Sequence, residues 1–501
     1  MSSSTPQPTV PGAATPRATQ ELRRRFPALP YATVPRTDLA VSHIGIGTYR
    51  VRPETEQHRE ALLAAFRAGV NLVDTSAHFG GGMSELLIGD AIREATTTGI
   101  LSREELVVAS KAGFVMGHPI KKHSGHAEIS EGVGHCISPS FLESEISGSL
   151  ERLGLESLDV FLINCPERML HAKNTHVSKQ QLYDMLGQAF QALENEVARG
   201  RIGSYGVASN SMHVPASPEH ISIAHILEVA TPNMSTIQIP FNLFERDAMM
   251  EGYDGAPSLL ETCMEKDLFV MVQRPLFSIW HGQVRLLASK PDLRIEDEPQ
   301  VTAALSDRFQ AATQLELELA GLLGSSEADT ALVAKFVWAQ VLAENLTRLT
   351  ENGFAAEHYF TKEMIPAIEA DLVLLDKHAK EHAQAEGQTI LEAWGSSYRD
   401  ELRALMDSII LMCQMRALQA NMDLNGVLTA LAPRALDRDA ALATNVLRVG
   451  LSAMRHVAPA SSILVGMRTP DYVARAFSAA SQPQLDEATL QALFDSPALQ
   501  Q

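Results

Sequence analysis

Short apolar runs alternate with segments of helical periodicity over the first half of the chain. The runs are four to six residues long, which is typical of buried strands. Strand followed by helix, seven times over, predicts a parallel sheet joined by crossover helices. The predicted strands are 44–48, 71–74, 106–111, 158–163, 204–208, 235–239 and 268–272, and the predicted helices between them include 57–68, 85–94, 139–153, 180–199 and 218–229.

An eighth strand is predicted late in the chain, at 462–465, and a helix follows it from Pro470. Eight strand–helix units favour an α/β fold closed into a TIM (β/α)8 barrel over an open sheet. Between the seventh and eighth strands the periodicity is helical, over 303–323, 330–349, 359–385, 396–420 and 440–456.

We interpret this helical region as a large all-helical insertion after strand seven. It can act as a lid over the barrel, or it can only stabilise or oligomerise the protein, and periodicity does not separate these roles. The predicted organisation is a disordered tail at 1–30, barrel strands one to seven at 31–280, the insertion at 281–439, strand eight with the closing helices at 440–485, and a C-terminal tail at 486–501.

Composition narrows the class of protein. The 501 residues carry a formal net charge of -19, which argues against nucleic acid or an anionic membrane as a partner. No apolar run is long enough to span a bilayer, and the N-terminus lacks the apolar segment of a secretion signal. The four cysteines are widely spaced, as in a reducing compartment. We therefore expect a cytoplasmic protein that acts on a small-molecule substrate.

The stretch from Asn71 to Gly89 carries the first candidate chemistry. An apolar strand ends at Asp74, a glycine-rich turn follows at 80–82, and Ser84 is the expected N-cap of the next helix. Barrel enzymes place their functional side chains where a strand ends and a loop begins. Asp74 is therefore a candidate site residue.

Eight motifs in chain order, each in or beside a predicted strand, strengthen this interpretation. They are GIGTYRV at 45–51, DTSAHFGGGMSE at 74–85, VVASKAGF at 107–114, SLERLGLESLDVFLINCPE at 149–167, GVASN at 206–210, QIPFNL at 238–243, RPL at 274–276 and LVGMRTPDYV at 464–473. On these motifs the chain resembles the aldo-keto reductase family over nearly all of its length outside the tail and the insertion.

The resemblance implies hydride transfer between a nicotinamide and a carbonyl or alcohol carbon. In the family a tyrosine gives the proton, a lysine and an aspartate tune that tyrosine, and a histidine orients the substrate oxygen. The aspartate and the lysine correspond to Asp74 and Lys111, whereas Phe79 stands in place of the tyrosine and Asn164 in place of the histidine. Phe79 has no proton to give, although Asn164 can still donate a hydrogen bond.

Three interpretations of this altered site stay open. Another group can give the proton, either His78 beside Phe79 or Lys111 itself. The site can bind a nicotinamide yet use Lys111 for a lyase-like proton abstraction or elimination without net redox. The fold can also be an inactive enzyme that senses the cofactor or holds a partner.

The resemblance also assigns cofactor-binding positions. Gln273 stands where an aromatic residue stacks on the nicotinamide, and Arg274 is then a candidate contact for the pyrophosphate. The turn before Pro470 suits a phosphate, and Arg468 in it suits a 2′-phosphate, which favours NADP with NAD as the alternative. The implied cofactor-binding residues are Gly47, Thr48, Tyr49, Ser209, Asn210, Gln238, Gln273, Arg274, Gly466 and Arg468.

A histidine-rich loop is predicted after the third strand, from Met116 to Ile137. Its possible metal ligands are His118, His123, His126, His135 and Cys136. Their spacing matches no short-range metal site, and a flexible polar loop explains it more simply, so no metal is predicted. The sequence fixes neither the substrate nor the oligomeric state.

Overall fold

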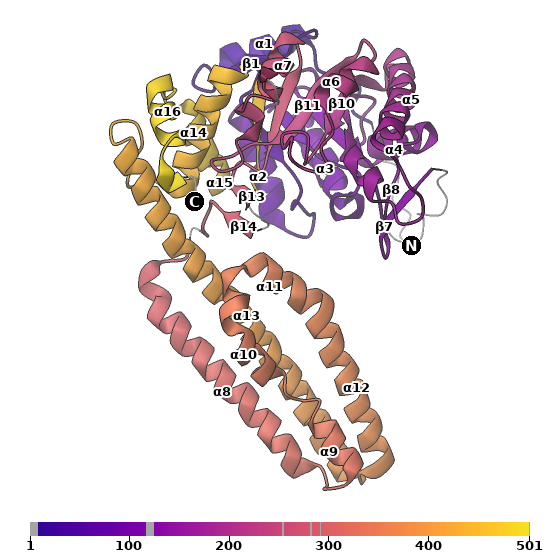
Figure 1. Ribbon diagram of the computed structural model, residues 1–501, viewed down its shortest axis with the longest axis vertical. Helices are drawn as coiled ribbons and strands as arrows, with labels where there is room; N and C mark the ends of the chain where they lie inside the picture. Colours follow the sequence, from indigo (N-terminus) through magenta and orange to yellow (C-terminus); the bar gives the residue numbers. More distant parts are fainter. Residues whose placement is uncertain (1–8, 117–124, 253–254, 281–282, 291, 500–501) are drawn as a thin grey trace. The chain divides into compact units, whose positions relative to one another are not determined.

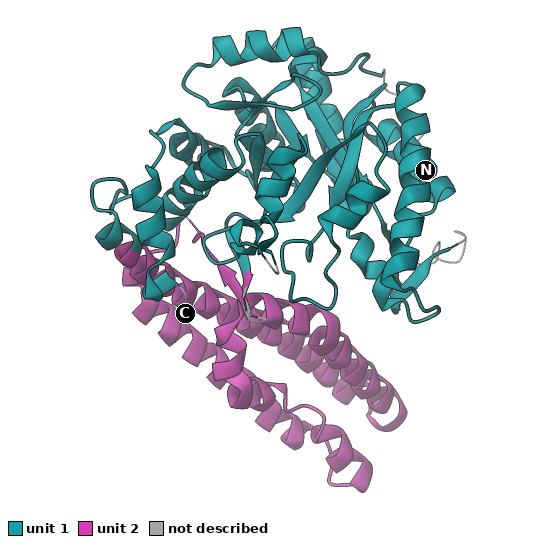
Figure 2. Ribbon diagram, turned by 45° about the horizontal axis from the view of Figure 1, so that its top comes forward, with its two compact units in different colours: residues 1–278, 428–501 teal, residues 279–427 magenta. Residues whose placement is uncertain are grey.

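The computed structural model describes residues 9–116, 125–252, 255–280, 283–290 and 292–499 of the chain. The chain divides into two compact units, residues 1–278 with 428–501 and residues 279–427 (Figure 2). Each unit is described by itself below. No helix among the described residues combines the length and the apolar character needed to cross a membrane.

The first unit contains a closed barrel of eight parallel strands, as the alternating pattern predicts. Each strand begins and ends within two residues of its predicted bounds. In order around the barrel the strands are β3 (Ile44–Gly47), β4 (Leu72–Asp74), β5 (Val107–Ala112), β9 (Leu158–Asn164), β10 (Ile202–Ala208), β11 (Met234–Pro240), β12 (Phe269–Gln273) and β15 (Ser461–Val465).

Amphipathic helices return the chain between these strands. They are α2 (Glu56–Arg67), α3 (Met83–Thr97), α4 (Pro139–Leu153), α5 (Lys179–Ala198), α6 (Ile223–Glu228), α7 (Leu259–Glu265) and α14 (Leu442–Val457), with α15 (Pro470–Ser481) and α16 (Glu487–Phe494) after the last strand (Figure 1). The predicted cap at Ser84 is wrong. Helix α3 follows Gly82, whose φ of 92° suits glycine, and the Ser84 hydroxyl donates to the carbonyl oxygen of Thr48.

An antiparallel hairpin of β1 (Tyr31–Thr33) and β2 (Ala40–Ser42) precedes the barrel. Ala32 and Val41 of the hairpin share one buried cluster with barrel residues such as Leu72, Val160 and Met271. Apolar side chains therefore fill the barrel interior, so the polar side chains of a site are left to the carboxyl ends of the strands.

Two segments of the first unit differ from the prediction. Residues 16–25, placed in a disordered tail, form helix α1 (Pro16–Arg25), because Thr15 caps it and Leu22 is fully buried. Much of the predicted flexible loop after β5 forms a three-stranded antiparallel sheet, made of β6 (Phe114–Met116), β8 (Val133–His135) and β7 (Ala127–Ser130). Residues 1–8 and 117–124 lie outside the described residues.

The second unit, residues 279–427, overlaps the predicted insertion at 281–439 but ends twelve residues earlier. A two-stranded sheet of β13 (Phe277–Trp280) and β14 (Gln283–Leu286) comes before its helices. The predicted helix 330–349 is broken, because the turn at 334–337 carries Phe336 into the core against Trp394 and Tyr398. The helices are α8 (Glu298–Leu322), α9 (Glu327–Val333), α10 (Trp338–Glu351), α11 (Gly353–Tyr359), α12 (Ile365–His382) and α13 (Ala385–Leu431), with a π-helical turn at Phe360–Met364 (Figure 1).

Candidate active site

A buried ion pair joins two neighbouring barrel strands. Asp74 is the last residue of β4, and Lys111 lies on β5, which pairs with β4 in parallel. The Lys111 Nζ lies 2.6 Å from each carboxylate oxygen of Asp74 and 2.9 Å from the carbonyl oxygen of Thr75. An ammonium group has three hydrogens, and these acceptors use them all. Lys111 is therefore a fixed positive charge whose hydrogens are already bonded within the protein.

Gln238, on β11, adds a second donor to Asp74. Its Nε2 donates to Asp74 Oδ1 at 2.9 Å, and because a carboxylate only accepts, this bond fixes the orientation of the amide. The other end of the amide, Oε1, is buried and has no hydrogen-bond partner among the residues that the structure describes. A buried acceptor without a partner is costly, so Gln238 Oε1 marks a place for the donor of a ligand.

Phe79 packs directly against this ion pair. The Lys111 Nζ lies 5.0 Å from the centre of the Phe79 ring, in the range of a cation–π contact. The Tyr49 ring makes an edge-type contact with Phe79 at 5.2 Å between ring centres. Phe79 is 8% exposed and is followed by Gly80 and Gly81, both at positive φ. The ring thus shapes the site and offers no ionisable group.

His78 stands beside Phe79 with its ring half-buried. Its Nδ1 is 2.8 Å from the Ser76 hydroxyl. Burial, the positive charge of Lys111 and the nearby His135 ring together lower the pKa of His78 from 6.5 to about 4, and burial has the largest effect. His78 is consequently a neutral imidazole at pH 7, placed next to the ion pair.

Asn164 is the last residue of β9, and its side-chain amide has a hydrogen-bond donor that is not used within the described residues. The thiol of Cys165 donates to Asn164 Oδ1 at 3.4 Å, while Nδ2 has no protein acceptor in the described part of the chain. Burial raises the pKa of the Cys165 thiol far above its ordinary value, so this cysteine stays protonated and is no nucleophile.

Asn210 lies in the loop after β10 and is held by three neighbours. Its Nδ2 donates to Cys165 Sγ at 3.1 Å, and its Oδ1 accepts from Gln273 Nε2 at 3.0 Å. Its backbone N–H donates to Glu167 Oε1 at 2.7 Å. The neighbouring Ser209 hydroxyl accepts from two backbone N–H groups of the following turn. The structure therefore brings Asn210 and Gln273 together, although strand β11 lies between β10 and β12 in the barrel.

Glu167 is a functional candidate that sequence reasoning missed. It is fully buried, and burial raises its pKa to about 7 although the Asn210 N–H opposes that shift. Its Oε2 has no partner among the described residues. The available signal was a carboxylate directly after the polar end of a strand that is buried along its whole length.

The remaining predicted cofactor positions lie in three loops. Thr48, after Gly47, donates its hydroxyl to the carbonyl oxygen of Asp74 at 2.9 Å, whereas Tyr49 is 68% exposed. Arg274 pairs with Glu245 at 2.8 Å, so its charge is balanced within the protein.

The turn between β15 and α15 holds Gly466 and Arg468. Thr469 caps α15, and Pro470 occupies the first turn, which leaves a well-formed helix N-terminus. A side chain at Gly466 would meet no atom within 4 Å, so the backbone is open there. Arg468 makes no hydrogen bond or ion pair with another described residue, and it lies near enough to His58 to lower the pKa of that histidine together with burial.

The comparison with known families decides what this barrel is. The model described as "Aldo/keto reductase family" matches residues 43–370, which is more than half of the chain. The chain belongs to the aldo/keto reductase family.

Two relatives of the chain within this family are named for different activities. The chain is 24% identical over 251 residues to the NADH-specific methylglyoxal reductase of Escherichia coli (strain K12), covering 48% of this chain and 65% of the relative. It is 26% identical over 175 residues to the NADP-dependent D-sorbitol-6-phosphate dehydrogenase of Malus domestica, covering 33% of this chain and 48% of the relative. The chain thus spans about half to two thirds of these relatives' lengths.

Among solved structures, the chain is similar to a glycerol dehydrogenase from Gluconobacter oxydans, at 18% sequence identity and a TM-score of 0.44. The superposition covers 93% of this chain and 94% of the dehydrogenase chain.

The described part of the chain brings no three His, Cys, Asp or Glu side chains together as metal ligands. His118 and His123 lie outside the described residues. His135 is fully buried and its Nε2 lies 2.7 Å from the carbonyl oxygen of Asn164, so this ring supports the end of β9. His126 approaches Glu128 instead.

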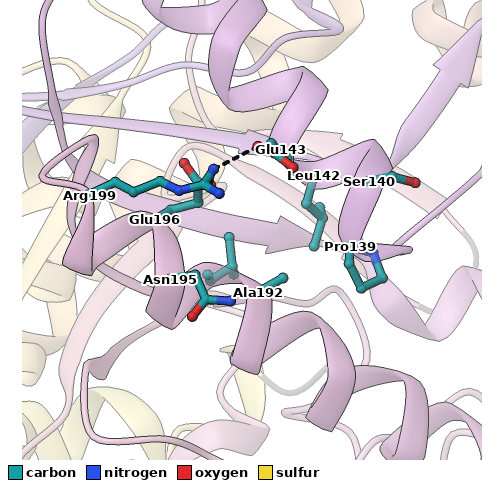
Figure 3. A pocket seen from close by; sticks show the side chains of 9 residues that line it. Pro139, Ser140, Leu142, Glu143, Ala192, Asn195, Glu196 and Arg199 are labelled. Carbon is teal, nitrogen blue, oxygen red and sulfur yellow. Dashed lines mark hydrogen bonds and ion pairs between the residues drawn. The ribbon is translucent and has the colours of Figure 1, made fainter.

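A hollow of about 310 Å³ lies between α4 and α5 of the barrel unit (Figure 3). Its lining includes Leu142, Leu193 and three charged residues, of which Arg199 pairs with Glu143 at 2.7 Å and Glu196 at 2.9 Å. None of the predicted site residues lines this hollow, so it forms no part of the candidate active site.

Proposed function

We propose that this aldo/keto reductase binds NADP(H) and interconverts a small carbonyl compound and its alcohol in an atypical active site. The observation that carries the proposal is the unpartnered Gln238 Oε1 beside the Asp74–Lys111 pair. A nicotinamide carboxamide has an NH2 group that can donate to this oxygen, and its carbonyl can accept from a neighbouring donor. The buried acceptor thus fits the group that the family implies.

When bound, the nicotinamide supplies or accepts the hydride. The chain's own residues have separate tasks. Asn164 Nδ2 is available to donate to the substrate oxygen, and Lys111 adds a fixed positive charge that stabilises negative charge developing nearby. Arg468, unpaired within the described residues at the start of α15, suits the extra phosphate of NADP better than the ribose hydroxyl of NAD.

A lyase-like reaction on Lys111 fits the geometry less well. A base or nucleophile needs a free lone pair, whereas the three acceptors around Lys111 Nζ hold it as a hydrogen-bonded ammonium. A nicotinamide-binding protein without turnover is the second candidate, because Phe79 removes the family's proton donor from its usual place.

Titration of NADPH, followed by the cofactor's own emission, tests binding. Trp280, Trp338 and Trp394 all belong to the helical unit, so protein fluorescence is the weaker probe. Gln238→Ala is expected to weaken NADPH binding by about tenfold, which is the contribution of one buried hydrogen bond. The exposed Gln57→Ala is the matched control. An undetectable NADPH complex of the unmodified protein would refute both the reductase and the cofactor-sensing proposals.

Consumption of bound NADPH in a single turnover then separates the two candidates. Aldehydes and quinones serve as oxidants, and absorbance of the reduced nicotinamide is the readout. Loss of absorbance supports the oxidoreductase, and binding without loss over the whole panel favours the binding protein.

A further inference from the structure

His78 has the chemistry of a proton-transfer group, and the interactions of its ring are specific. The ring lies 4.9 Å from Phe79 and 5.0 Å from Phe114 between centres, so two aromatic side chains hold its plane. The titratable groups that face it are Lys111 from β5 and His135 from β8. Its orientation is therefore fixed within the same group of residues as the ion pair.

Ser76 determines which nitrogen of His78 carries the proton. The Ser76 hydroxyl donates to the carbonyl oxygen of Lys111 at 2.8 Å, and that oxygen can only accept. Ser76 has a single hydroxyl hydrogen, so toward His78 its oxygen must act as the acceptor. The 2.8 Å contact with Nδ1 is then an Nδ1–H donation. The neutral ring consequently carries its lone pair on Nε2, which makes no hydrogen bond with another described residue.

A neutral histidine with its hydrogen on Nδ1 can accept a proton at Nε2. It can donate a proton from Nε2 only as the imidazolium, when both ring nitrogens carry hydrogen. Protonation is opposed by burial and by the Lys111 charge, which hold the pKa near 4. At pH 7 nearly every His78 ring is neutral and able to accept a proton, and almost none is protonated and able to donate one.

We propose that His78 Nε2 is the proton acceptor of this enzyme and that its favoured reaction at neutral pH is the oxidation of an alcohol. This inference rests on the proposed function. In the step, the substrate O–H bond breaks and its proton goes to Nε2, while the carbon–oxygen bond becomes double. The hydrogen on that carbon leaves with its electron pair as hydride to the oxidised nicotinamide dinucleotide, the co-reactant. The imidazolium then releases its proton to solvent, because the Lys111 charge disfavours it.

The tautomer can be measured without cofactor or substrate. Nitrogen-15 spectra of histidine-labelled full-length protein at pH 7 are expected to show a protonated Nδ1 and a pyridine-like Nε2 for His78, assigned by the loss of those signals in His78→Gln. Ser76→Ala removes the acceptor of Nδ1–H and is expected to shift the ring toward the Nε2–H tautomer. A protonated Nε2 in the unmodified protein at pH 7 would overturn the proposal.

Turnover gives the second readout. The probes are 2-propanol, glycerol and benzyl alcohol with NADP+, and acetone, glyceraldehyde and benzaldehyde with NADPH. Oxidation is expected to change little between pH 8 and 5, whereas reduction rises about tenfold for each unit of acidification, as the protonated fraction does. His78→Gln is expected to lose at least about 100-fold in both directions, and the exposed His176→Gln is the control.

The NADP+ affinity of His78→Gln keeps the two proposals distinguishable. An unchanged affinity with lost turnover supports His78 as a catalytic residue. An unchanged affinity with unchanged turnover refutes the role of His78 and leaves the proposed oxidoreductase intact. Absence of NADP(H) binding in the unmodified protein refutes the proposed function itself, whatever the spectra show.

Discussion

The Lys111 ammonium lies 5.0 Å from the centre of the Phe79 ring. The cation is thus held against an aromatic face at the position where the family resemblance places a phenol. The Phe79 ring and the Asp74–Lys111 ion pair beside it are both buried.

Phe79→Tyr tests whether the missing hydroxyl limits reduction. A phenol beside Lys111 can give a proton at pH 7, so we expect carbonyl reduction by NADPH to rise by at least about tenfold. Phe79→Leu, which removes the ring without adding a donor, is the control and should show no gain. An unchanged rate in Phe79→Tyr would mean that this position does not reach the substrate oxygen.

The buried ion pair makes a sharp prediction about stability. Lys111→Met leaves the Asp74 charge buried and uncompensated, so the free energy of unfolding of the barrel unit should fall by about 3–5 kcal/mol. Adding Asp74→Asn should recover part of that loss, since the charge is then gone as well. Urea unfolding followed by far-ultraviolet circular dichroism measures both variants, and a double variant as unstable as Lys111→Met would contradict the coupling.

His135 makes stability depend on pH. Burial lowers its pKa from 6.5 to about 4, so between these values the unfolded chain takes up a proton that the folded chain does not. The free energy of unfolding should therefore fall as the pH drops from about 6.5 to about 4, with a slope of up to ~1.4 kcal/mol per pH unit from this residue. Urea midpoints at pH 7, 5.5 and 4.5 measure it. His135→Gln should show a shallower slope, and the exposed His176→Gln should match the unmodified protein.

Leu402, fully buried in the helical unit, tests whether that unit affects the site. Leu402→Ala should lower the stability of this unit by about 3 kcal/mol, visible as an earlier transition in tryptophan fluorescence. All of the predicted cofactor residues lie in the barrel unit, so NADPH affinity without denaturant should stay unchanged. A tenfold weaker affinity would instead identify the unit as a lid.

The proximity of Asp74 and Lys111 could be predicted from the sequence, because polar residues at the carboxyl ends of neighbouring parallel strands lie at one edge of the barrel. The sequence was insufficient for the state of His78, which depends on a backbone carbonyl 33 residues away that pattern and motif do not reveal. Helix α13 runs over 47 residues, well beyond the predicted 396–420, because tertiary packing continues the helix through residues of low helix propensity such as Gly395 and Gly426.

Strand β15 pairs with β12 on one side and β3 on the other, and the whole helical unit separates it from β12 in the sequence. A chain emerging from the ribosome therefore exposes two unpaired strand edges until β15 at 461–465 has been made. Early folding of the helices would bring the two flanking chain ends closer and so reduce the entropy lost on closure. We expect variants that delay helix formation to aggregate during synthesis, even where the finished protein is stable.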